Sequence, residues 1–310
     1  MIPTSPSTSS LVDAAPRQLG SFLVGPLALG TWRLTSETEA SGQELIESAL
    51  GQGINLIDTA DVYGLDWGGT GFGTSEDLIG RALADVASLR DQIVLATKGG
   101  IIPGVPYDSS DGYLTEAVDA SLRRLHTDRI DLYQIHRPDL YTAPRDLAAS
   151  MLSLREKGKV VEFGVSNFTP WQFSALQHHL PFPLVSSQPQ FSASHLDPMR
   201  DGTFDLCMTH GVVPLVWSPL GGGGLVGAAP GDDGPRSELL DVLLKLADRE
   251  NTDRATVALA FVLAHPARPI PILGTTKPSR IAEAVEAYRV HLSRADCYSI
   301  IESSDGVPLP

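Results

Sequence analysis

The sequence predicts an α/β protein folded as a closed (β/α)8 barrel of the TIM type, and three observations support this prediction. First, about eight short apolar segments of strand length alternate with segments of helical periodicity. Second, no linker or change of composition divides this alternation. Third, 310 residues are enough for one such barrel. Alternation of this kind indicates a parallel sheet covered by helices, and an open doubly wound sheet is the competing arrangement.

The predicted strands are short and apolar, and most of them end at a polar residue. A short strand or hairpin is expected over residues 18–24. The eight strands of the barrel are expected at 26–30, 54–57, 92–97, 130–135, 160–165, 184–187, 213–216 and 271–273.

The predicted helices have apolar residues at helical spacing and recognisable ends. Ser36 and Glu39 have the spacing of a capping box for a helix over 38–50. Thr169 and Pro170 suit the N-cap and the first turn of another helix. The remaining helices are expected at about 74–87, 114–125, 143–156, 199–210, 238–248, 254–264 and 278–288, and the segment after them is mixed.

The barrel is expected to be a single domain over residues 16–310, after a flexible N-terminal tail over 1–15. The first ten residues are rich in Ser, Thr and Pro, and they lack the basic start and apolar segment of a secretory signal. No apolar run approaches the roughly 20 residues that span a bilayer. We therefore expect a soluble cytoplasmic protein, monomeric or a small homo-oligomer, without a membrane partner.

The composition is acidic, with 23 Lys and Arg against 37 Asp and Glu and a formal net charge of −14. Such a chain repels nucleic acid and anionic membranes, so no nucleic-acid partner is expected and a phosphate ligand requires a local cluster of donors. Cys207 and Cys297 lie far apart and without metal-ligand spacing. Neither a disulfide framework nor a metal site is expected.

The stretch from Ile54 to Gly64 combines a buried strand with two groups that can exchange protons. Asp58 is expected at the carboxyl end of the strand, and Tyr63 lies in the loop that follows. An acid at a strand end with a tyrosine beside it is a possible proton-transfer pair. The alternative for this stretch alone is a capping Asp and a half-buried Tyr.

Polar residues recur at the carboxyl ends of the other predicted strands, and in a barrel these ends converge on one face, where barrel enzymes hold their active sites. Taken singly, Lys98 could be a surface lysine and His136 a structural histidine. Their succession on three strand ends favours a shared site. The convergent set is Thr31, Asp58, Lys98, His136, Ser166, Asn167, Gln188, Trp217 and Thr275.

The expected cluster is chemically coherent as a general acid aimed at a carbonyl oxygen. A tyrosine has a reference pKa of about 10, and the ammonium of Lys98 favours the phenolate and lowers that pKa. Asp58 can pair with Lys98, and His136 can orient the tyrosine or bind a substrate oxygen. No group in this set supplies a hydride, so a redox cofactor is required.

These residues and their surroundings resemble the tetrad of the aldo-keto reductase superfamily. The resemblance extends from about Leu27 to Ala287, nearly the whole chain. Phe163 to Pro170 and Trp217 to Gly223 are further similar to a bacterial branch of oxidoreductases of undefined substrate. The matching motifs are Asp58-Thr59-Ala60, Tyr63-Gly64, Lys98, Ile135-His136 with Pro138, Gly164 to Phe168, Gln188, Trp217 to Leu220 and Gly274 to Arg280.

The resemblance implies a role for each matching residue. Tyr63 is implied as the general acid, Asp58 and Lys98 as the pair that tunes it, and His136 as the orienting group. Ser166, Asn167 and Gln188 are implied to hold the nicotinamide carboxamide, with Trp217 stacked on the ring. The other implied cofactor contacts are Thr31, Asp58, Gly274 and Thr275, then Ser218, Pro219 and Leu220 at the pyrophosphate, and Lys277 and Arg280 at the adenosine 2′-phosphate.

The resemblance also implies which residues line the substrate pocket, and the sequence differs from the superfamily pattern at one position. Tyr63 and His136 are expected to face the substrate, with Trp32 and Trp67 as pocket walls. Many relatives carry Glu-Asn after the arginine, whereas this chain has Glu283-Ala284, so the adenine contact of that Asn is not carried over.

A glycine pattern after the predicted strand 213–216 matches the letters of a dinucleotide-binding fingerprint. Gly222, Gly224 and Gly227 satisfy G-x-G-x-x-G, but Pro230 and further glycines follow them instead of a helix. The fingerprint requires a strand, turn and helix in succession. We therefore interpret this segment as a loop that folds over the cofactor.

The leading hypothesis is an NADP(H)-dependent oxidoreductase that reduces an aldehyde or ketone to an alcohol, or catalyses the reverse, with NAD(H) the less favoured cofactor. One alternative is a Schiff-base aldolase, because Lys98 could attack a carbonyl if it were neutral. A further alternative is a non-catalytic sensor or subunit that binds NADP(H). The expected ligand in the leading hypothesis is a small carbonyl compound or alcohol.

Overall fold

The computed structural model describes residues 9–36, 41–65, 68–227 and 237–310. Eight parallel strands form a closed barrel in the order β10-β3-β4-β5-β6-β7-β8-β9. Because β10 pairs with both β3 and β9, the sheet has no open edge, and the predicted (β/α)8 barrel is confirmed over the doubly wound alternative. The strands are β3 (Ala28–Gly30), β4 (Leu56–Asp58), β5 (Val94–Gly99), β6 (Ile130–Ile135), β7 (Val160–Ser166), β8 (Ser186–Gln188), β9 (Val213–Val216) and β10 (Ile270–Leu273).

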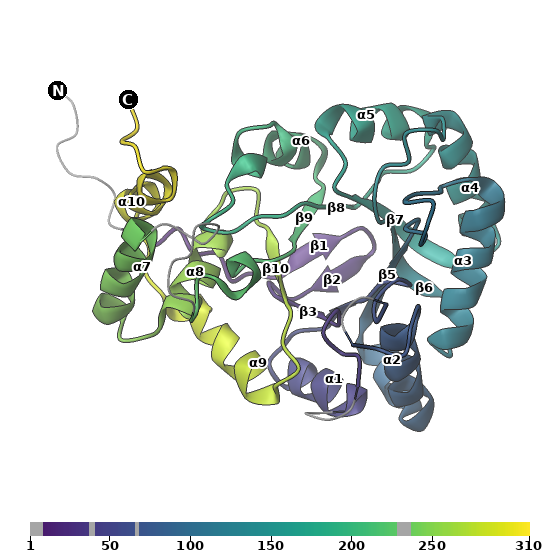
Figure 1. The fold of residues 1–310 in the computed structure, drawn as a ribbon, viewed down its shortest axis with the longest axis horizontal. Helices are drawn as coiled ribbons and strands as arrows, with labels where there is room; N and C mark the ends of the chain where they lie inside the picture. Colours follow the sequence, from purple (N-terminus) through teal and green to yellow (C-terminus); the bar gives the residue numbers. More distant parts are fainter. Residues whose placement is uncertain (1–8, 37–40, 66–67, 228–236) are drawn as a thin grey trace.

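Helices surround the barrel, as Figure 1 shows, and their apolar sides cover the outer face of the strands. The α-helices are α1 (Gly42–Gly51), α2 (Thr74–Asp85), α3 (Asp111–Arg124), α4 (Pro144–Glu156), α5 (Pro170–His179), α6 (Thr203–His210), α7 (Ser237–Glu250), α8 (Arg254–Leu263), α9 (Pro278–Ala284) and α10 (Arg294–Asp305). Short 3-10 helices are η1 (Ala87–Gln92), η2 (Asp197–Met199), η3 (Gly221–Gly223) and η4 (Val285–Arg289).

An antiparallel hairpin of β1 (Arg17–Leu19) and β2 (Phe22–Val24) lies across the barrel and is visible through its centre in Figure 1. Leu19 and Val24 are buried among apolar side chains from the first residues of the barrel strands, such as Ala28. The hairpin therefore closes the amino-terminal end of the barrel, and only the carboxyl ends of the strands are left to form a site.

The first barrel helix begins later than predicted. Ser41 and Glu44 form its capping box, with the Glu44 amide donating to Ser41 Oγ and the Ser41 amide donating to Glu44 Oε2. The predicted box of Ser36 and Glu39 has the same spacing, and Glu39 lies outside the described residues. Gly42, the first residue of α1, approaches α2 closely: a Cβ there would lie 2.9 Å from the Leu78 carbonyl oxygen.

Two further elements differ from the sequence-based expectation. The helix predicted over 199–210 is divided into η2 and α6, because Gly202 has a positive φ of 89° and interrupts the helical backbone. The mixed C-terminal segment contains α10, which a capping box of Ser293 and Asp296 starts. Helix α10 buries Ile300 and Ile301 in the apolar layer around α7 and α8.

The described part of the predicted N-terminal tail is anchored to the barrel. The backbone amide of Leu11 donates to the Leu292 carbonyl, and that of Asp13 donates to the Leu263 carbonyl. The Asp13 carboxylate also pairs with Arg268 at 2.7 Å. Composition did not indicate these contacts, and residues 1–8 lie outside the described residues.

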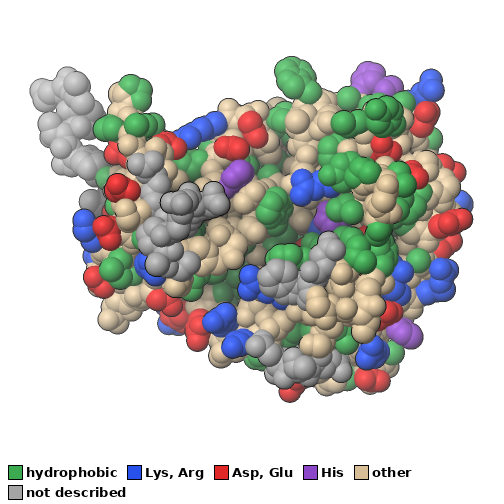
Figure 2. Space-filling model, viewed as in Figure 1, with side chains coloured by type: hydrophobic (Ala, Val, Ile, Leu, Met, Phe, Trp, Pro, Cys, Tyr) green, Lys and Arg blue, Asp and Glu red, His purple; other side chains and the backbone are tan. Residues whose placement is uncertain are grey.

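The surface carries charges of both signs. On the face shown in Figure 2, Lys and Arg side chains alternate with Asp and Glu side chains, and the described residues form no continuous basic surface there. None of the helices within the described ranges combines the length and apolar character needed to cross a bilayer. The same residues include no group of three or more His, Cys, Asp or Glu side chains placed to hold a metal ion.

Candidate active site

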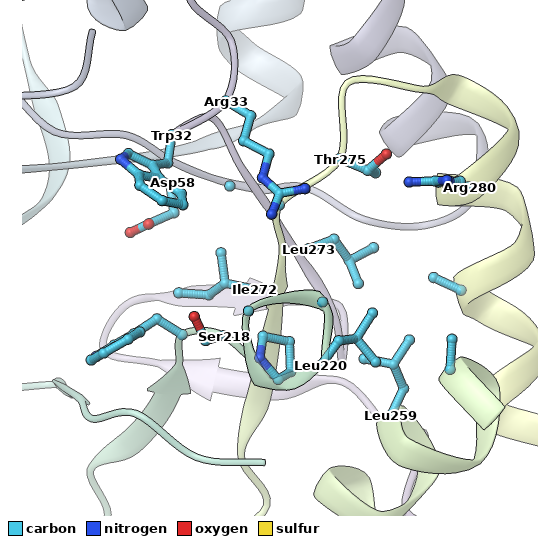
Figure 3. A pocket seen from close by; sticks show the side chains of 18 of the residues that line it. Trp32, Arg33, Asp58, Ser218, Leu220, Leu259, Ile272, Leu273, Thr275 and Arg280 are labelled. Atoms are coloured by element: carbon cyan, nitrogen blue, oxygen red, sulfur yellow. The ribbon is translucent and has the colours of Figure 1, made fainter. Parts of the chain in front are cut away.

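A cavity of about 730 Å³ opens at the carboxyl ends of the barrel strands. In Figure 3, Trp32 and Asp58 lie at one end of this cavity, and Thr275 and Arg280 lie at the other. Most of the predicted site residues line it: Trp32, Asp58, Tyr63, His136, Ser166, Asn167, Gln188, Trp217, Ser218, Pro219, Leu220, Gly274, Thr275 and Arg280. The sequence therefore located the cavity before its shape was known.

Lys98, Asp58 and Tyr63 form a hydrogen-bonded group at the ends of β4 and β5. Lys98 Nζ lies 2.7 Å from Asp58 Oδ2 and 3.1 Å from the Tyr63 hydroxyl oxygen. A third bond, of 2.8 Å, runs from Lys98 Nζ to the Thr59 carbonyl. The Lys98 side chain is fully buried, so these three acceptors take the place of the water molecules that would hydrate its ammonium group. Adjacent parallel strands bring the residues together, as their order in the sequence predicted.

The net pKa shift of Tyr63 differs from the one expected from the sequence. Burial raises the pKa of this phenol and outweighs the lowering by Lys98, and Asp58 raises it further. The sequence argument considered the cation but not the loss of water around the hydroxyl. Tyr63 is therefore a protonated phenol at neutral pH, which is the form required of a proton donor.

Lys98 is held in its charged form. Burial alone would lower its pKa, but the Asp58 carboxylate and Tyr63 raise it, and the net pKa lies above the usual value. An ammonium in this state has no lone pair with which to attack a carbonyl. The amine therefore stabilises charge on its neighbours instead of acting as a nucleophile.

The second oxygen of Asp58 is bound from inside the barrel. Gln188 Nε2 donates to Asp58 Oδ1 at 3.0 Å, and Gln134 Nε2 donates to the same atom at 3.3 Å. Ser186 Oγ in turn donates to Gln134 Oε1 at 3.1 Å. Three side chains, Lys98, Gln188 and Gln134, thus donate to the carboxylate of Asp58. Gln188 also lines the cavity.

His136 lies beside Tyr63 as a neutral imidazole. The two rings meet edge to face with centroids 5.8 Å apart. Burial, then the charges of Lys98 and Arg137, lower the pKa of His136 well below 6.5. Its buried Nδ1 makes no hydrogen bond with the described part of the chain. The imidazole can therefore orient an oxygen near Tyr63 without carrying a charge.

Ser166, Asn167 and Trp217 form a second polar group at the ends of β7 and β9. Asn167 Nδ2 donates to Ser166 Oγ at 2.8 Å, and Trp217 Nε1 donates to Asn167 Oδ1 at 3.1 Å. Asn167 has a positive φ of 59°, and Ser218 next to Trp217 has one of 51°. Such backbone is uncommon outside glycine, and here it directs both segments into the cavity.

Two predicted cofactor residues do not line the cavity as expected, and one predicted substrate residue is not described. Thr31 is buried beneath it and bonded to Ser75 Oγ at 2.7 Å. Lys277 is the exposed N-cap residue of α9 and lies outside the cavity lining. Trp67 lies outside the described residues. Sequence spacing placed Thr31 and Lys277 near the site but could not decide which way their side chains turn.

Sequence reasoning missed Gln134, Arg33 and Arg137. Gln134 and Asp131 are the two strongly polar residues in the buried strand β6, and an amide side chain in a buried strand was the signal available for Gln134. Arg33 and Arg137 follow two predicted site residues directly and line the cavity. Figure 3 shows the guanidinium of Arg33 directed into the space between Asp58 and Arg280.

The cavity has the donor groups that a dinucleotide requires. Amide and hydroxyl groups of Ser166 and Asn167 lie at the Tyr63 end, and the exposed guanidinium of Arg280 lies at the far end. Apolar side chains, among them Leu220 and Leu259, line the middle. Glu283 and Ala284, which stand where many relatives carry Glu-Asn, both line the cavity.

Comparison with known proteins shows the family to which this barrel belongs. The sequence matches the aldo/keto reductase family over residues 26–305. It is 43% identical over 298 residues to a 6-dehydroglucose reductase of Novosphingobium aromaticivorans, covering 95% of this chain and 97% of that protein. It is 35% identical to a 6-dehydroglucose reductase of Agrobacterium fabrum, with 88% and 92% covered.

A solved structure shows the same fold. The glycerol dehydrogenase of Gluconobacter oxydans superposes with a TM-score of 0.81 at 27% sequence identity, covering 96% of this chain and 97% of that chain. The protein therefore belongs to the aldo/keto reductase family, and the predicted resemblance is confirmed. It is an oxidoreductase of carbonyl compounds and alcohols, in a family that uses a nicotinamide cofactor.

Proposed function

We propose that this protein is an NADP(H)-dependent reductase in which Tyr63 gives a proton to the carbonyl oxygen of an aldehyde or ketone. The observation that carries the proposal is the buried contact of Lys98 Nζ with Tyr63 and Asp58, at 3.1 and 2.7 Å. A neutral phenol beside an ammonium can release its proton to a carbonyl oxygen because the ammonium stabilises the phenolate that forms.

The other residues of the site have supporting roles in this proposal. Asp58 holds Lys98 charged, and Gln134 and Gln188 hold Asp58. Neutral His136 orients the carbonyl oxygen toward the phenol. Ser166 and Asn167 bind the amide of the nicotinamide, and Trp217, which Asn167 holds by its indole N–H, lies against the ring. Reduced nicotinamide supplies a hydride when it is bound.

We propose NADP(H) in preference to NAD(H) because of Arg280. Its exposed guanidinium lies at the end of the cavity farthest from Asp58, where an adenosine 2′-phosphate is expected. Arginine binds phosphate through parallel charge-assisted hydrogen bonds. In a chain of net charge −14, such a local cation is what an anionic ligand requires.

The substrate class proposed is a hydroxylated aldehyde. Both relatives compared above are named as reductases of 6-dehydroglucose, an aldehyde that carries several hydroxyl groups. The charged state of Lys98 disfavours the Schiff-base aldolase, because that reaction begins with a neutral amine. The cytoplasmic location and the oligomeric state stay predictions.

The test is turnover of small aldehydes by wild type and Tyr63→Phe, followed by NADPH absorbance. We expect Tyr63→Phe to keep its affinity for NADPH and to lose roughly 10²–10⁴-fold in kcat, as is typical for removal of a general acid. Tyr298→Phe, which changes a half-exposed tyrosine of α10, is the matched control. Near-wild-type turnover by Tyr63→Phe would overturn the assignment.

A further inference from the structure

Arg137 is a cation at the reactive end of the cavity that the proposed proton transfer does not use. It follows His136 directly, at the start of the loop between β6 and α4, and its half-buried side chain lines the cavity with Tyr63, His136 and Trp32. After burial and the charge of Lys98, the charge of Arg137 also lowers the pKa of His136, as expected for neighbouring residues that line one cavity.

Arg137 forms no hydrogen bond and no ion pair within the described residues, whereas the other charged groups near it are engaged. Lys98 is bound to Asp58 and Tyr63. The carboxylate of Asp139, two residues further on, accepts bonds from the Ser109 amide at 2.9 Å and the Thr142 hydroxyl at 2.6 Å. Among the described residues, neither Asp58 nor Asp139 forms an ion pair with the guanidinium of Arg137.

A half-buried cation without a partner has lost part of its hydration, and no hydrogen bond or ion pair compensates for that loss. A structural role would place a carboxylate or carbonyl within reach, as the acidic composition easily allows. The position of Arg137 instead leaves its five N–H donors available to a molecule in the cavity. The planar guanidinium suits two neighbouring oxygens better than one.

We infer that Arg137 determines specificity by binding two neighbouring hydroxyl oxygens of the aldehyde substrate. The inference rests on the proposed function, in which a hydroxylated aldehyde is reduced at Tyr63. Hydroxyl groups are favoured over an anionic substituent because the relatives compared above are named for 6-dehydroglucose, a neutral sugar aldehyde. The aromatic rings of Trp32 and Trp217 line the same end of the cavity and suit the apolar face of such a sugar.

The test compares D-glyceraldehyde with propanal, which has the same three carbons and no hydroxyl groups. Wild type is expected to show a higher kcat/KM for glyceraldehyde. In Arg137→Met this preference falls about tenfold or more, as expected when hydrogen bonds to a charged group are lost. Arg289→Met, at an exposed arginine paired with Glu286 in η4, should keep the wild-type ratio. An unchanged ratio in Arg137→Met would overturn the inference.

Arg137→Lys separates hydroxyl binding from simple charge attraction. Lysine keeps the charge but not the planar pair of donors, so the preference for glyceraldehyde should stay low. If Arg137 served only to attract anions, neither variant would change the ratio for these two neutral aldehydes, and Arg137→Met would lose activity on glyoxylate that Arg137→Lys keeps. That pattern contradicts the inference.

Binding of D-glucose to the NADPH complex distinguishes failure of the inference from failure of the proposed function. Titration calorimetry should show weaker glucose binding by Arg137→Met than by wild type and by Arg289→Met. This measurement is decisive even if no aldehyde is turned over. Wild-type inactivity on every aldehyde would reject the proposed function, whereas equal glucose binding by the three proteins would reject the role of Arg137.

Discussion

Tyr63 shows how burial and charge compete at a single residue. A neighbouring ammonium lowers the pKa of a phenol, but loss of water raises it, and here the loss of water is the larger effect. The sequence shows which charged residues lie at the carboxyl ends of neighbouring strands, because the strands of this barrel follow one another in sequence order. It does not show how far a hydroxyl is removed from solvent, so the sign of the shift required the structure.

The two cations predicted at the cofactor phosphate differ in position, which leads to a prediction. Arg280 lines the cavity and Lys277 does not. Arg280→Ala should therefore weaken NADPH binding roughly 10- to 100-fold, as for hydrogen bonds lost to a charged group, and NADH binding much less. Lys277→Ala is the comparison variant and should have a smaller effect. Dissociation constants from quenching of tryptophan fluorescence at fixed ionic strength give the measurement, and equal losses for both cofactors would show that Arg280 does not bind the 2′-phosphate.

Packing between α2 and α3 depends on the absence of a side chain at Gly80. A Cβ at this position would lie 1.8 Å from the Arg124 carbonyl oxygen, a backbone atom at the end of α3 that cannot turn away. Gly112 in the first turn of α3 has open space around its Cβ position. The two glycines thus separate the effect of packing from the effect of backbone freedom.

We predict that Gly80→Ala and Gly112→Ala change stability in opposite directions. Gly80→Ala should lower the free energy of unfolding by about 1–3 kcal/mol or more, since α2 and α3 must move apart. Gly112→Ala should raise it by up to about 1 kcal/mol, because alanine loses less backbone freedom on folding. Urea unfolding followed by far-ultraviolet circular dichroism compares them. A Gly80→Ala protein as stable as Gly112→Ala would mean that the helices have room to adjust.

Elements with strong local signals were predicted, and those set by tertiary contacts were not. The strand over 130–135 and the helix start at Thr169 and Pro170 agree with β6 and α5, because apolar runs and capping residues are local. The two Ser-x-x-Glu pairs before α1 have the same local pattern. The local pattern therefore does not decide between them, and the structure forms the capping box at Ser41 and Glu44. Helix α10 escaped prediction because its apolar face becomes evident only against α7 and α8.

The candidate site follows from the closed barrel more than from any single motif. Asp58, Lys98 and His136 lie 38 or more residues from one another in sequence, yet they end neighbouring strands and meet. Alternation of strands and helices was enough to predict this convergence. The alternation did not identify Gln134 or Arg137. Gln134 matters because it donates to Asp58, and Arg137 matters because it lines the cavity without a hydrogen-bond partner among the described residues.

The whole molecule should lose stability in mild acid because it buries neutral histidine. Burial lowers the pKa of His265 to about 4, with Asp205 opposing the shift, and burial also lowers the pKa of His136 well below its usual value. His265 packs against Phe204 with centroids 4.5 Å apart, and its Nδ1 accepts a bond from the Ala267 amide at 3.1 Å. In the unfolded chain the same side chain has a pKa of about 6.5.

The sign of the pH dependence follows from which state binds more protons. Between about pH 6.5 and pH 4 the unfolded chain takes up a proton at His265 and the folded protein does not, so stability falls as the pH falls through this range. His265→Asn should give a shallower fall, since asparagine can accept the Ala267 bond but does not titrate. His291→Asn, at an exposed histidine, should keep the wild-type slope. Urea midpoints measured from pH 7 to pH 4.5 decide the matter, and identical slopes for wild type and His265→Asn would show that His265 is protonated in the folded protein as readily as in the unfolded chain.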